Sequence, residues 1–304
     1  MSGALDPRHY TAHVMHRTDR AWTETNCYAD LWIEILHAHG LDPHAMLAFT
    51  LGIDFEGDQW TFFKPSQLTL RALYGVEVEE LNVWLDLRSN THVQLQRGRI
   101  VLAEADAFFL PDTAATDYRQ QHTKTTIGII RLDDQRCDYF HNAGFFTLGG
   151  ADLACLFAPR EMPFYAEIAK FDHRVVRTES ELRALSRETL RETLAFRPHE
   201  NPFVPFAAQL REVTTLGLAH WHKHAFANLR QCGAAFELAR DYLVWLDTSH
   251  HAAAAACEEI SQTAKSLILK GARAANGKRV FDAGEAMSAL AKSWDRVMQA
   301  LVAK

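Results

Sequence analysis

Several features are missing from this sequence, and each absence excludes a class of protein. Among its 304 residues there is no apolar run of 18 residues, so we expect no membrane-spanning helix. Basic residues (32 Lys and Arg) are outnumbered by acidic ones (38 Asp and Glu), and the resulting net charge of −6 argues against nucleic acid as a partner. The first twenty residues have no apolar core of a signal peptide, so we expect a cytoplasmic protein.

Cysteine pairs and nucleotide-binding motifs are also missing. There are five cysteines, an odd number, and their wide spacing without a CxxC pair argues against a disulfide framework or a cysteine zinc site. No Walker A, GxGxxG or GxSxG pattern occurs, so nucleotide-dependent and serine-hydrolase chemistry lack support. We therefore expect neither a bound cofactor nor a metal, and we look among the five thiols for a nucleophile.

The composition that remains is globular, with 48% hydrophobic and 23% charged residues. Residues 1–177 mix strand-like and helical patterns, whereas residues 178–304 have helical spacing almost throughout. We expect helices over 179–196, 206–250 with one break, 252–274 and 283–303. The sequence therefore predicts an α+β protein, with an N-terminal domain built on an antiparallel sheet (1–177) and a C-terminal antiparallel helical bundle (178–304).

The N-terminal domain has one clear helix and three clear strands. Residues 26–43 have apolar residues at helical spacing, and Gly40 followed by Pro43 ends the pattern. Residues 97–110 and 122–134 read as strands, and Asp133 and Asp134 can turn the chain into a third strand over 136–144. The last two strands predict a hairpin with polar groups at its open end.

Cys27 lies at the start of the predicted helix 26–43. Unpaired backbone amides and the helix dipole favour a thiolate there, and the same amides can stabilise an oxyanion. A cysteine nucleophile also needs a base and an orienting group. His122 opens one hairpin strand and Asn142 ends the next, which predicts a Cys27–His122–Asn142 triad. The alternatives are a buried helical cysteine, a surface histidine and a turn residue, and His141 is a rival base.

Four polar residues are candidates for substrate binding. Asn26 can cap the helix or donate to substrate, and Glu56 and Asp58 can line a pocket unless they belong to a turn about Gly57. Asp106 lies on an apolar strand, where a buried carboxylate needs a partner. A metal site at His220 and His224, four residues apart on one helical face, is less favoured than core histidines because no third ligand is evident.

A family resemblance rests on segments that follow one another in order: NCYADLWIEILHAHG, DFEGDQWTFFKP, EADAFFLPDT, HTKTTIGIIRLDD, YFHNAG and, in the helical part, HAFANLRQCGAAFELA. These resemble the DUF1839 family of bacterial proteins over most of the chain. A more distant similarity extends to BtrH-like acyltransferases and to C39-like members of the papain-like cysteine superfamily. That similarity places the nucleophile on Cys27, the histidine on His122 and the orienting residue on Asn142. The usual oxyanion glutamine is absent, because its position is Ala21.

The resemblance implies an acyltransferase. It implies that an acyl group, here an aminoacyl group, moves from a thioester on the 4′-phosphopantetheine of a carrier protein to a small-molecule amine through an acyl-enzyme. A carrier protein is acidic around its arm, and the densest basic run of the chain is our candidate docking patch, with a solvated helix end as the alternative: Lys265, Lys270, Arg273, Lys278 and Arg279. Three other functions stay open: a cysteine hydrolase (thioesterase or amidase), a non-catalytic carrier-protein-binding module, and a histidine metalloenzyme.

Overall fold

The computed structural model describes residues 5–158, 161–162, 164–279 and 281–302. The chain forms two compact units that alternate along the sequence. The sheet unit comprises Met1–Arg17, Cys27–Pro43 and Gln67–Arg177, and the helical unit comprises Thr18–Asn26, His44–Ser66 and Thr178–Lys304. The helical unit thus includes two segments, 18–26 and 44–66, that lie within the predicted N-terminal domain 1–177.

The sheet unit is built on six strands in the order β1-β6-β2-β3-β4-β5, and the neighbouring strands are antiparallel. This confirms the α+β class and the antiparallel sheet. Sequence patterns located β2, β3 and β4, but β5 and the short strands β1 and β6 were not expected. The strands are β1 (Glu77–Glu80), β2 (Ile100–Asp106), β3 (Lys124–Leu132), β4 (Arg136–His141), β5 (Gly144–Gly149) and β6 (Ala166–Lys170).

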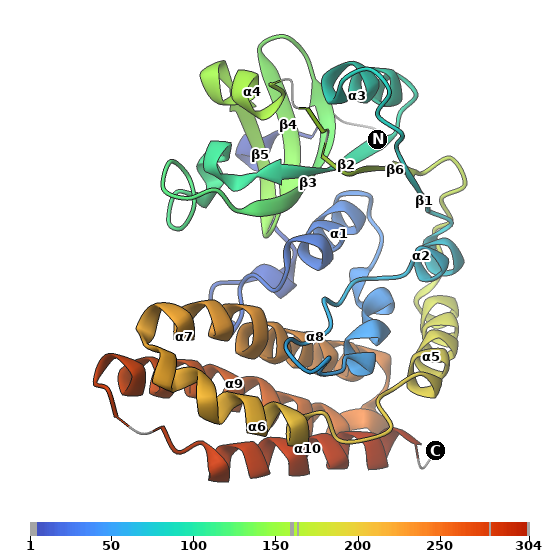
Figure 1. Ribbon diagram of the computed structural model, residues 1–304. Coiled ribbons are helices and arrows are strands. Elements are labelled where there is room, and N and C mark those ends of the chain that lie inside the picture. Colours follow the sequence, from blue (N-terminus) through green and yellow to red (C-terminus); the bar gives the residue numbers. More distant parts are fainter. Residues whose placement is uncertain (1–4, 159–160, 163, 280, 303–304) are drawn as a thin grey trace. The chain divides into compact units, whose positions relative to one another are not determined.

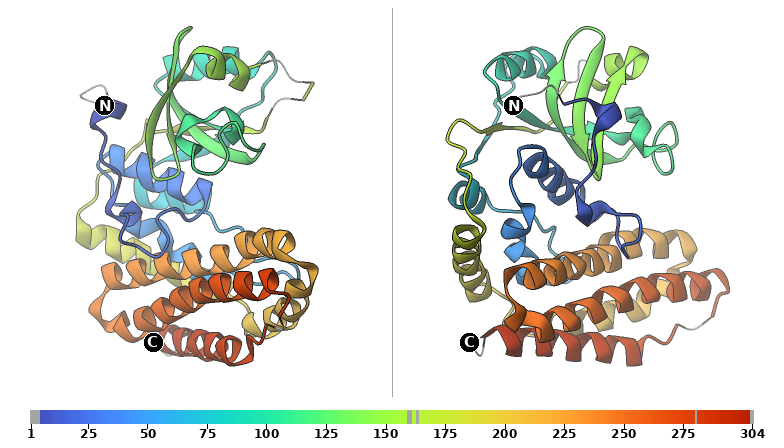
Figure 2. Two further views of the ribbon diagram at one scale, coloured as in Figure 1. Left: turned by 90° about the vertical axis from the view of Figure 1, so that its left-hand side faces the viewer. Right: turned by 180° about the vertical axis from the view of Figure 1, so that it is seen from behind.

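Helices cover both faces of this sheet (Figures 1 and 2). Helix α1 (Cys27–Ala38) lies on one face, where Leu31 and Ile35 pack against Gly128 of β3. Helices α3 (Leu87–Gln96) and α4 (Gly150–Leu156) cover the opposite face, over a core of strand residues that alternate with those facing α1. Helix α2 (Gln67–Tyr74) leads into β1. The predicted helix 26–43 is therefore real, and it ends near Gly40, which adopts φ 66°.

The segment before α1 is fixed to it by a buried ion cluster. His16 has a fully buried side chain, its Nε2 lies 3.2 Å from Asp30 Oδ1, and its Nδ1 bonds to the Glu34 carboxylate. Burial alone lowers the pKa of His16, but the hydrogen bonds to Asp30 and Glu34 outweigh it and raise the pKa to about 9. His16 is therefore a protonated core residue.

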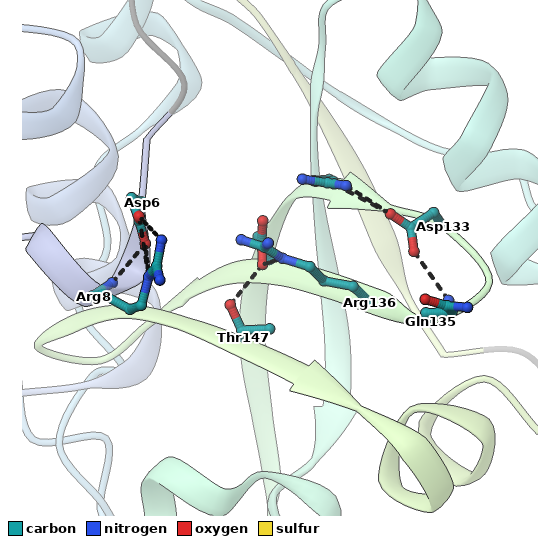
Figure 3. A network of polar contacts seen from close by, with 8 residues as sticks. Asp6, Arg8, Asp133, Gln135, Arg136 and Thr147 are labelled. Atoms are coloured by element: carbon teal, nitrogen blue, oxygen red, sulfur yellow. Dashed lines mark hydrogen bonds and ion pairs between the residues drawn. The ribbon is translucent and has the colours of Figure 1, made fainter.

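Short-range polar contacts organise the β3–β4 hairpin, drawn in Figure 3. At the turn, Asp133 accepts hydrogen bonds from the Gln135 amide (3.0 Å) and from Arg131 Nη2 (3.0 Å), as expected for an aspartate that turns the chain. Further along the hairpin, Asp138 accepts from Arg136 Nε (2.6 Å) and from the Thr147 hydroxyl (2.7 Å). The contacts of Asp133 stabilise the turn, and those of Asp138 connect neighbouring side chains of β4 and β5.

In the helical unit, the sequence located every long helix. A capping box at Thr178 and Glu181 starts α5, and a single break was expected within 206–250. The structure has two interruptions after α6, one at Gly217 (φ 92°) and one π-helical turn at 226–230. Residue 303, the end of the last predicted helix, is outside the described residues. The helices are α5 (Glu179–Ala195), α6 (Phe203–Val213), α7 (Leu218–Ala225), α8 (Gln231–Leu246), α9 (His251–Asn276) and α10 (Gly284–Val302).

Aromatic and hydroxyl side chains attach the segment 44–66 to these helices. Trp60 lies with its ring centroid 5.0 Å from that of Phe203, and its amide donates to Asn228 Oδ1 (3.2 Å). The Ser186 hydroxyl of α5 donates to the Ala45 carbonyl (2.9 Å). This segment is therefore part of the helical core. Across the described part of the chain, we find no helix whose length and apolar character would suit a bilayer.

Candidate functional site

Cys27 is the first residue of α1 and its side chain is partly exposed. All five cysteines are described by the structure, and none forms a disulfide. Of the five, only Cys27 and Cys155 of α4 are partly exposed. Cys137, Cys232 and Cys257 are buried, and burial raises the pKa of each of these three thiols. Because the helix dipole favours negative charge at a helix start and not at the position of Cys155, Cys27 is the better-placed candidate for a nucleophile.

A buried carboxylate fixes the first turn of α1 against the sheet. The Tyr28 hydroxyl donates to Glu167 Oε2 (2.6 Å), and the Tyr165 hydroxyl donates to the other oxygen of the same carboxylate (3.0 Å). Glu167 lies on β6 and is only 4% exposed. Sequence reasoning missed this contact, because Glu167 belongs to a five-residue strand that was not recognised.

His122 is held by Asp106. The imidazole Nδ1 lies 2.7 Å from Asp106 Oδ2, and the other carboxylate oxygen accepts the Phe108 amide (3.1 Å). The imidazole ring also stacks on Phe108, with centroids 4.3 Å apart and planes at 15°. A carboxylate can only accept, so Nδ1 carries the proton and Nε2 of the neutral ring is left as the basic nitrogen. With 69% of its side chain exposed, His122 can meet an external substrate.

Strand register places this pair on the face of the sheet that α1 covers. Leu102 of β2 is paired with Gly128 of β3, and a Cβ atom on Gly128 would meet Leu31 and Ile35 of α1 as well as Leu102, so Leu102 lies on the face that α1 covers. Asp106 lies four residues beyond Leu102 on the same strand, so its side chain is on the same face, about 13 Å further along. The start of α1, with Cys27, and the His122–Asp106 pair therefore lie on one face of one sheet.

The contact that orients His122 differs from the one expected. Asn142 was predicted to hold the imidazole, but the hydrogen bond observed is with Asp106, a residue predicted to bind substrate. Asn142 lies between β4 and β5 with φ 43°, a conformation that asparagine adopts in tight turns, which is the alternative that the sequence left open. A catalytic role for Asn142 stays a prediction.

His141, the rival base, is a structural residue. It is 1% exposed, its Nδ1 lies 2.6 Å from Asp112 Oδ2, and its Nε2 lies 2.7 Å from the Thr125 hydroxyl. Tyr139 donates to the same aspartate. Both ring nitrogens are occupied on the face opposite α1, so His141 is not placed to act on a substrate.

The remaining substrate-binding candidates belong to the helical unit. Asn26 is 4% exposed and its amide Nδ2 donates to the Phe63 carbonyl (2.7 Å), a contact within the fold. Glu56 accepts from the Thr61 hydroxyl (2.9 Å), and Gly57 has φ 96°, as expected for a turn about Gly57. Asp58 is exposed in the same turn. The structure thus brings together Asp106 and His122, and substrate roles for Asn26, Glu56 and Asp58 stay predictions.

Ala21, at the position where papain-like peptidases carry a glutamine, makes a contact within the fold. The amides of Ala21 and Trp22 both donate to the Glu237 carboxylate, at 3.0 Å each, and are therefore engaged inside the helical unit. Lys265 donates to the Ala21 carbonyl and lies 5.2 Å from the centroid of the Trp22 ring. Lys265 is exposed as well, so its place in the expected docking patch stays a prediction.

The histidine pair of α7 has an aromatic environment. His224 is buried, its Nε2 lies 2.9 Å from Gln209 Oε1, and its ring stacks with Phe206 and Trp221. Burial and the neighbouring His220 lower the pKa of His224 to about 4. Over the part of the chain that the structure describes, His, Cys, Asp and Glu side chains form no group of three able to hold a metal ion.

These features define a two-part α+β protein with a partly exposed helix-start cysteine and a carboxylate-bound histidine on one face of its sheet. The chain belongs to the DUF1839 family: the DUF1839 N-terminal domain matches residues 11–171, and the DUF1839 C-terminal domain matches residues 179–303. This confirms the resemblance noted from the sequence. No curated protein matches the chain. The similarity to BtrH-like and papain-like proteins stays a prediction.

Proposed function

We propose that the protein is a cysteine-dependent acyltransferase, with Cys27 as nucleophile, His122 as general base and Asp106 as the residue that orients His122. The observation that carries this proposal is the His122–Asp106 hydrogen bond (2.7 Å) on the face of the sheet where α1 begins with Cys27. We propose in addition that the sheet unit is a papain-like domain in the C39 style and that the C-terminal helices form an antiparallel bundle.

The proposed chemistry has two steps. His122 Nε2 accepts the thiol proton as the Cys27 sulfur attacks a thioester carbonyl, the bond to the carrier sulfur breaks, His122 returns the proton to that sulfur, and an acyl-enzyme forms. A small-molecule amine then attacks the acyl-enzyme, the bond between the acyl carbon and the Cys27 sulfur breaks, and His122 passes the amine proton to that sulfur as the amide product leaves. The charge of Asp106 stabilises the imidazolium in both steps. The Cys27 amide at the start of α1 is the proposed oxyanion donor.

The proposed donor is an aminoacyl group on the 4′-phosphopantetheine of a cytoplasmic carrier protein. Thioester exchange between two thiols is nearly balanced in energy, so a cysteine enzyme can accept the acyl group without another source of energy. The exposed His122 suits a substrate delivered on the arm of a second protein, because the ring is open to solvent. The five basic residues of the docking patch are all exposed and stay the candidate docking residues: Lys265, Lys270, Arg273, Lys278 and Arg279.

The experiment is intact-protein mass spectrometry after mixing with an aminoacylated carrier protein. We expect a mass increase of one aminoacyl group on Cys27, which persists until an amine is added. Cys27→Ala and His122→Ala should abolish this adduct, whereas Cys155→Ala, the matched substitution of the other partly exposed thiol, should keep it.

Each other result selects another function. Rapid release of the free amino acid without an amine would indicate a thioesterase or amidase. Absence of an adduct, together with equal alkylation of Cys27 and Cys155 by iodoacetamide, would contradict a cysteine enzyme. Binding of the carrier protein by Cys27→Ala with full biological activity would support a non-catalytic binding module.

A further inference from the structure

The helical unit contains a large cavity that is separate from the proposed catalytic residues, although two of the candidate docking residues, Lys278 and Arg279, belong to its lining. Its volume is 1420 Å³, and it is lined by residues of α6, of the start of α7, of the end of α9 and of α10. Drug-sized ligands occupy pockets of about 300–1,000 Å³, so this cavity has room for a longer molecule. It lies within one unit and does not involve Cys27 or His122.

Most of the lining is apolar. Phe203, Ala283 and Met287 are 1%, 6% and 4% exposed and form the inner part of the lining. Leu216 and Val204 line the cavity as well and are 62% and 66% exposed. Large apolar side chains that are exposed beside a cavity indicate a surface that an apolar ligand covers.

Two positive charges lie together at one place on this lining. Lys278 and Arg279 are consecutive, exposed and part of the cavity, and neither forms an ion pair with any residue that the structure describes. Asp282, also on the lining, accepts the Gly284 amide (2.9 Å) at the start of α10. Unpaired cations beside an apolar cavity favour a ligand with an anionic group.

We propose that this cavity binds a medium-chain aliphatic carboxylic acid. Its carboxylate would be held by Lys278 and Arg279, and its alkyl chain would lie along Phe203, Met287 and Leu216. A carboxylate suits the guanidinium group, which can donate two parallel hydrogen bonds to it. An acidic amphipathic helix of a protein partner is disfavoured, because it would need cations distributed along the groove, whereas those of the described lining are adjacent.

Calorimetric titration of the full chain with decanoate below its micellar concentration tests this proposal. We expect one site, with binding weakened about tenfold or more in Lys278→Gln/Arg279→Gln, since one charge-assisted hydrogen bond accounts for about that factor. Lys270→Gln/Arg273→Gln, a matched loss of two exposed charges of α9 outside the cavity lining, should bind decanoate within about twofold of the unchanged protein. Decanol should bind more weakly than decanoate.

A second variant narrows the cavity without altering its charge. Ser288 lines the cavity from an exposed position on α10, so Ser288→Trp should weaken decanoate binding and keep the circular dichroism spectrum. The proposal is overturned if the unchanged protein does not bind decanoate, if the two double variants bind it equally, or if decanol binds as tightly. Binding of an acidic amphipathic peptide in place of decanoate would overturn it in favour of a protein partner.

Discussion

The Asp106 carboxylate makes two contacts, one with each of its oxygens, and a substitution of Asp106 removes both. One oxygen holds His122 Nδ1 and the other accepts the Phe108 amide, so the carboxylate fixes both the tautomer and the loop that carries the stacking ring. A nearby negative charge stabilises the imidazolium that forms when the base accepts a proton. The proposed action of His122 as a general base should therefore depend on Asp106 more than on Asn142.

Asp106→Asn should slow acylation of Cys27 by at least about 100-fold, because the amide lacks the charge and can select the wrong tautomer. Rapid-quench mass spectrometry of the acyl-enzyme measures this rate. The matched variant is Asn142→Gly, which removes the side-chain amide, and glycine adopts the φ of 43° at this position without strain. It should change the rate by less than about threefold. The reverse pattern would return the orienting role to Asn142.

His16 predicts a pH dependence of stability. Its pKa of about 9 in the fold lies above its ordinary value of 6.5, so protonation stabilises the native state fully below pH 6.5. Between pH 6.5 and 9 the unfolded chain loses this proton and the native state keeps it. The free energy of unfolding should therefore fall by about 3 kcal/mol over this range.

Urea denaturation at pH 6.5 and pH 9 measures this fall, and two variants assign it. His16→Gln should remove most of the difference between the two pH values, whereas His9→Gln, at an exposed histidine of the same segment, should retain it. An equal fall in the His16→Gln protein would show that other groups cause it.

Among the elements, helices and long strands were predictable because their signals are local. The apolar spacing of 179–196 predicts α5, and the capping pair Thr178 and Glu181 lies where that spacing begins. Strands β1 and β6 have four and five residues, too few for a period of two to stand out, and their partners lie far away in sequence. The partner of His122 was missed for a related reason: the hairpin argument compared β3 with β4, whereas Asp106 lies on β2.

The contact of α1 with β3 depends on a residue without a side chain. A Cβ atom at Gly128 would lie 2.9 Å from Leu31 Cδ1 and 3.1 Å from Ile35 Cδ1. Gly128→Ala should therefore destabilise the protein by roughly 1–3 kcal/mol in urea denaturation, as overpacked cores do. Combined with Leu31→Ala, which provides space, the cost should be smaller than the sum of the two single changes. A strictly additive result would contradict this close approach.

At the scale of the whole molecule, alternation of the chain between its units was not predictable. Composition shifts once, near residue 178, and this led to two consecutive domains. The structure assigns 18–26 and 44–66 to the helical unit, through contacts such as Ala21 with Glu237 and Ala45 with Ser186. No local pattern reports a hydrogen bond between residues more than 200 positions apart.

The helical unit should therefore not fold from residues 178–304 alone. This fragment lacks Trp22, whose ring packs so closely on Gly233 of α8 that a Cβ atom there would lie only 2.5 Å from Trp22 Cζ2. It also lacks Trp60, whose side chain is buried, with 2% exposed. We expect the isolated fragment to show no cooperative transition in urea by circular dichroism, in contrast to the full chain. A fragment that unfolds cooperatively, with the stability of the full chain, would show that the two segments are dispensable.

The anchoring of residues 20–22 on α8 and α9 also has a consequence for synthesis on the ribosome. Trp22 leaves the exit tunnel early, but Glu237 and Ser261, to which its amide and its indole donate, are translated more than 200 residues later. Until then the indole ring stays in contact with water or with a chaperone, and closing so long a loop makes its docking a late folding event. Residues 20–22 thus reach their native place only when translation is almost complete.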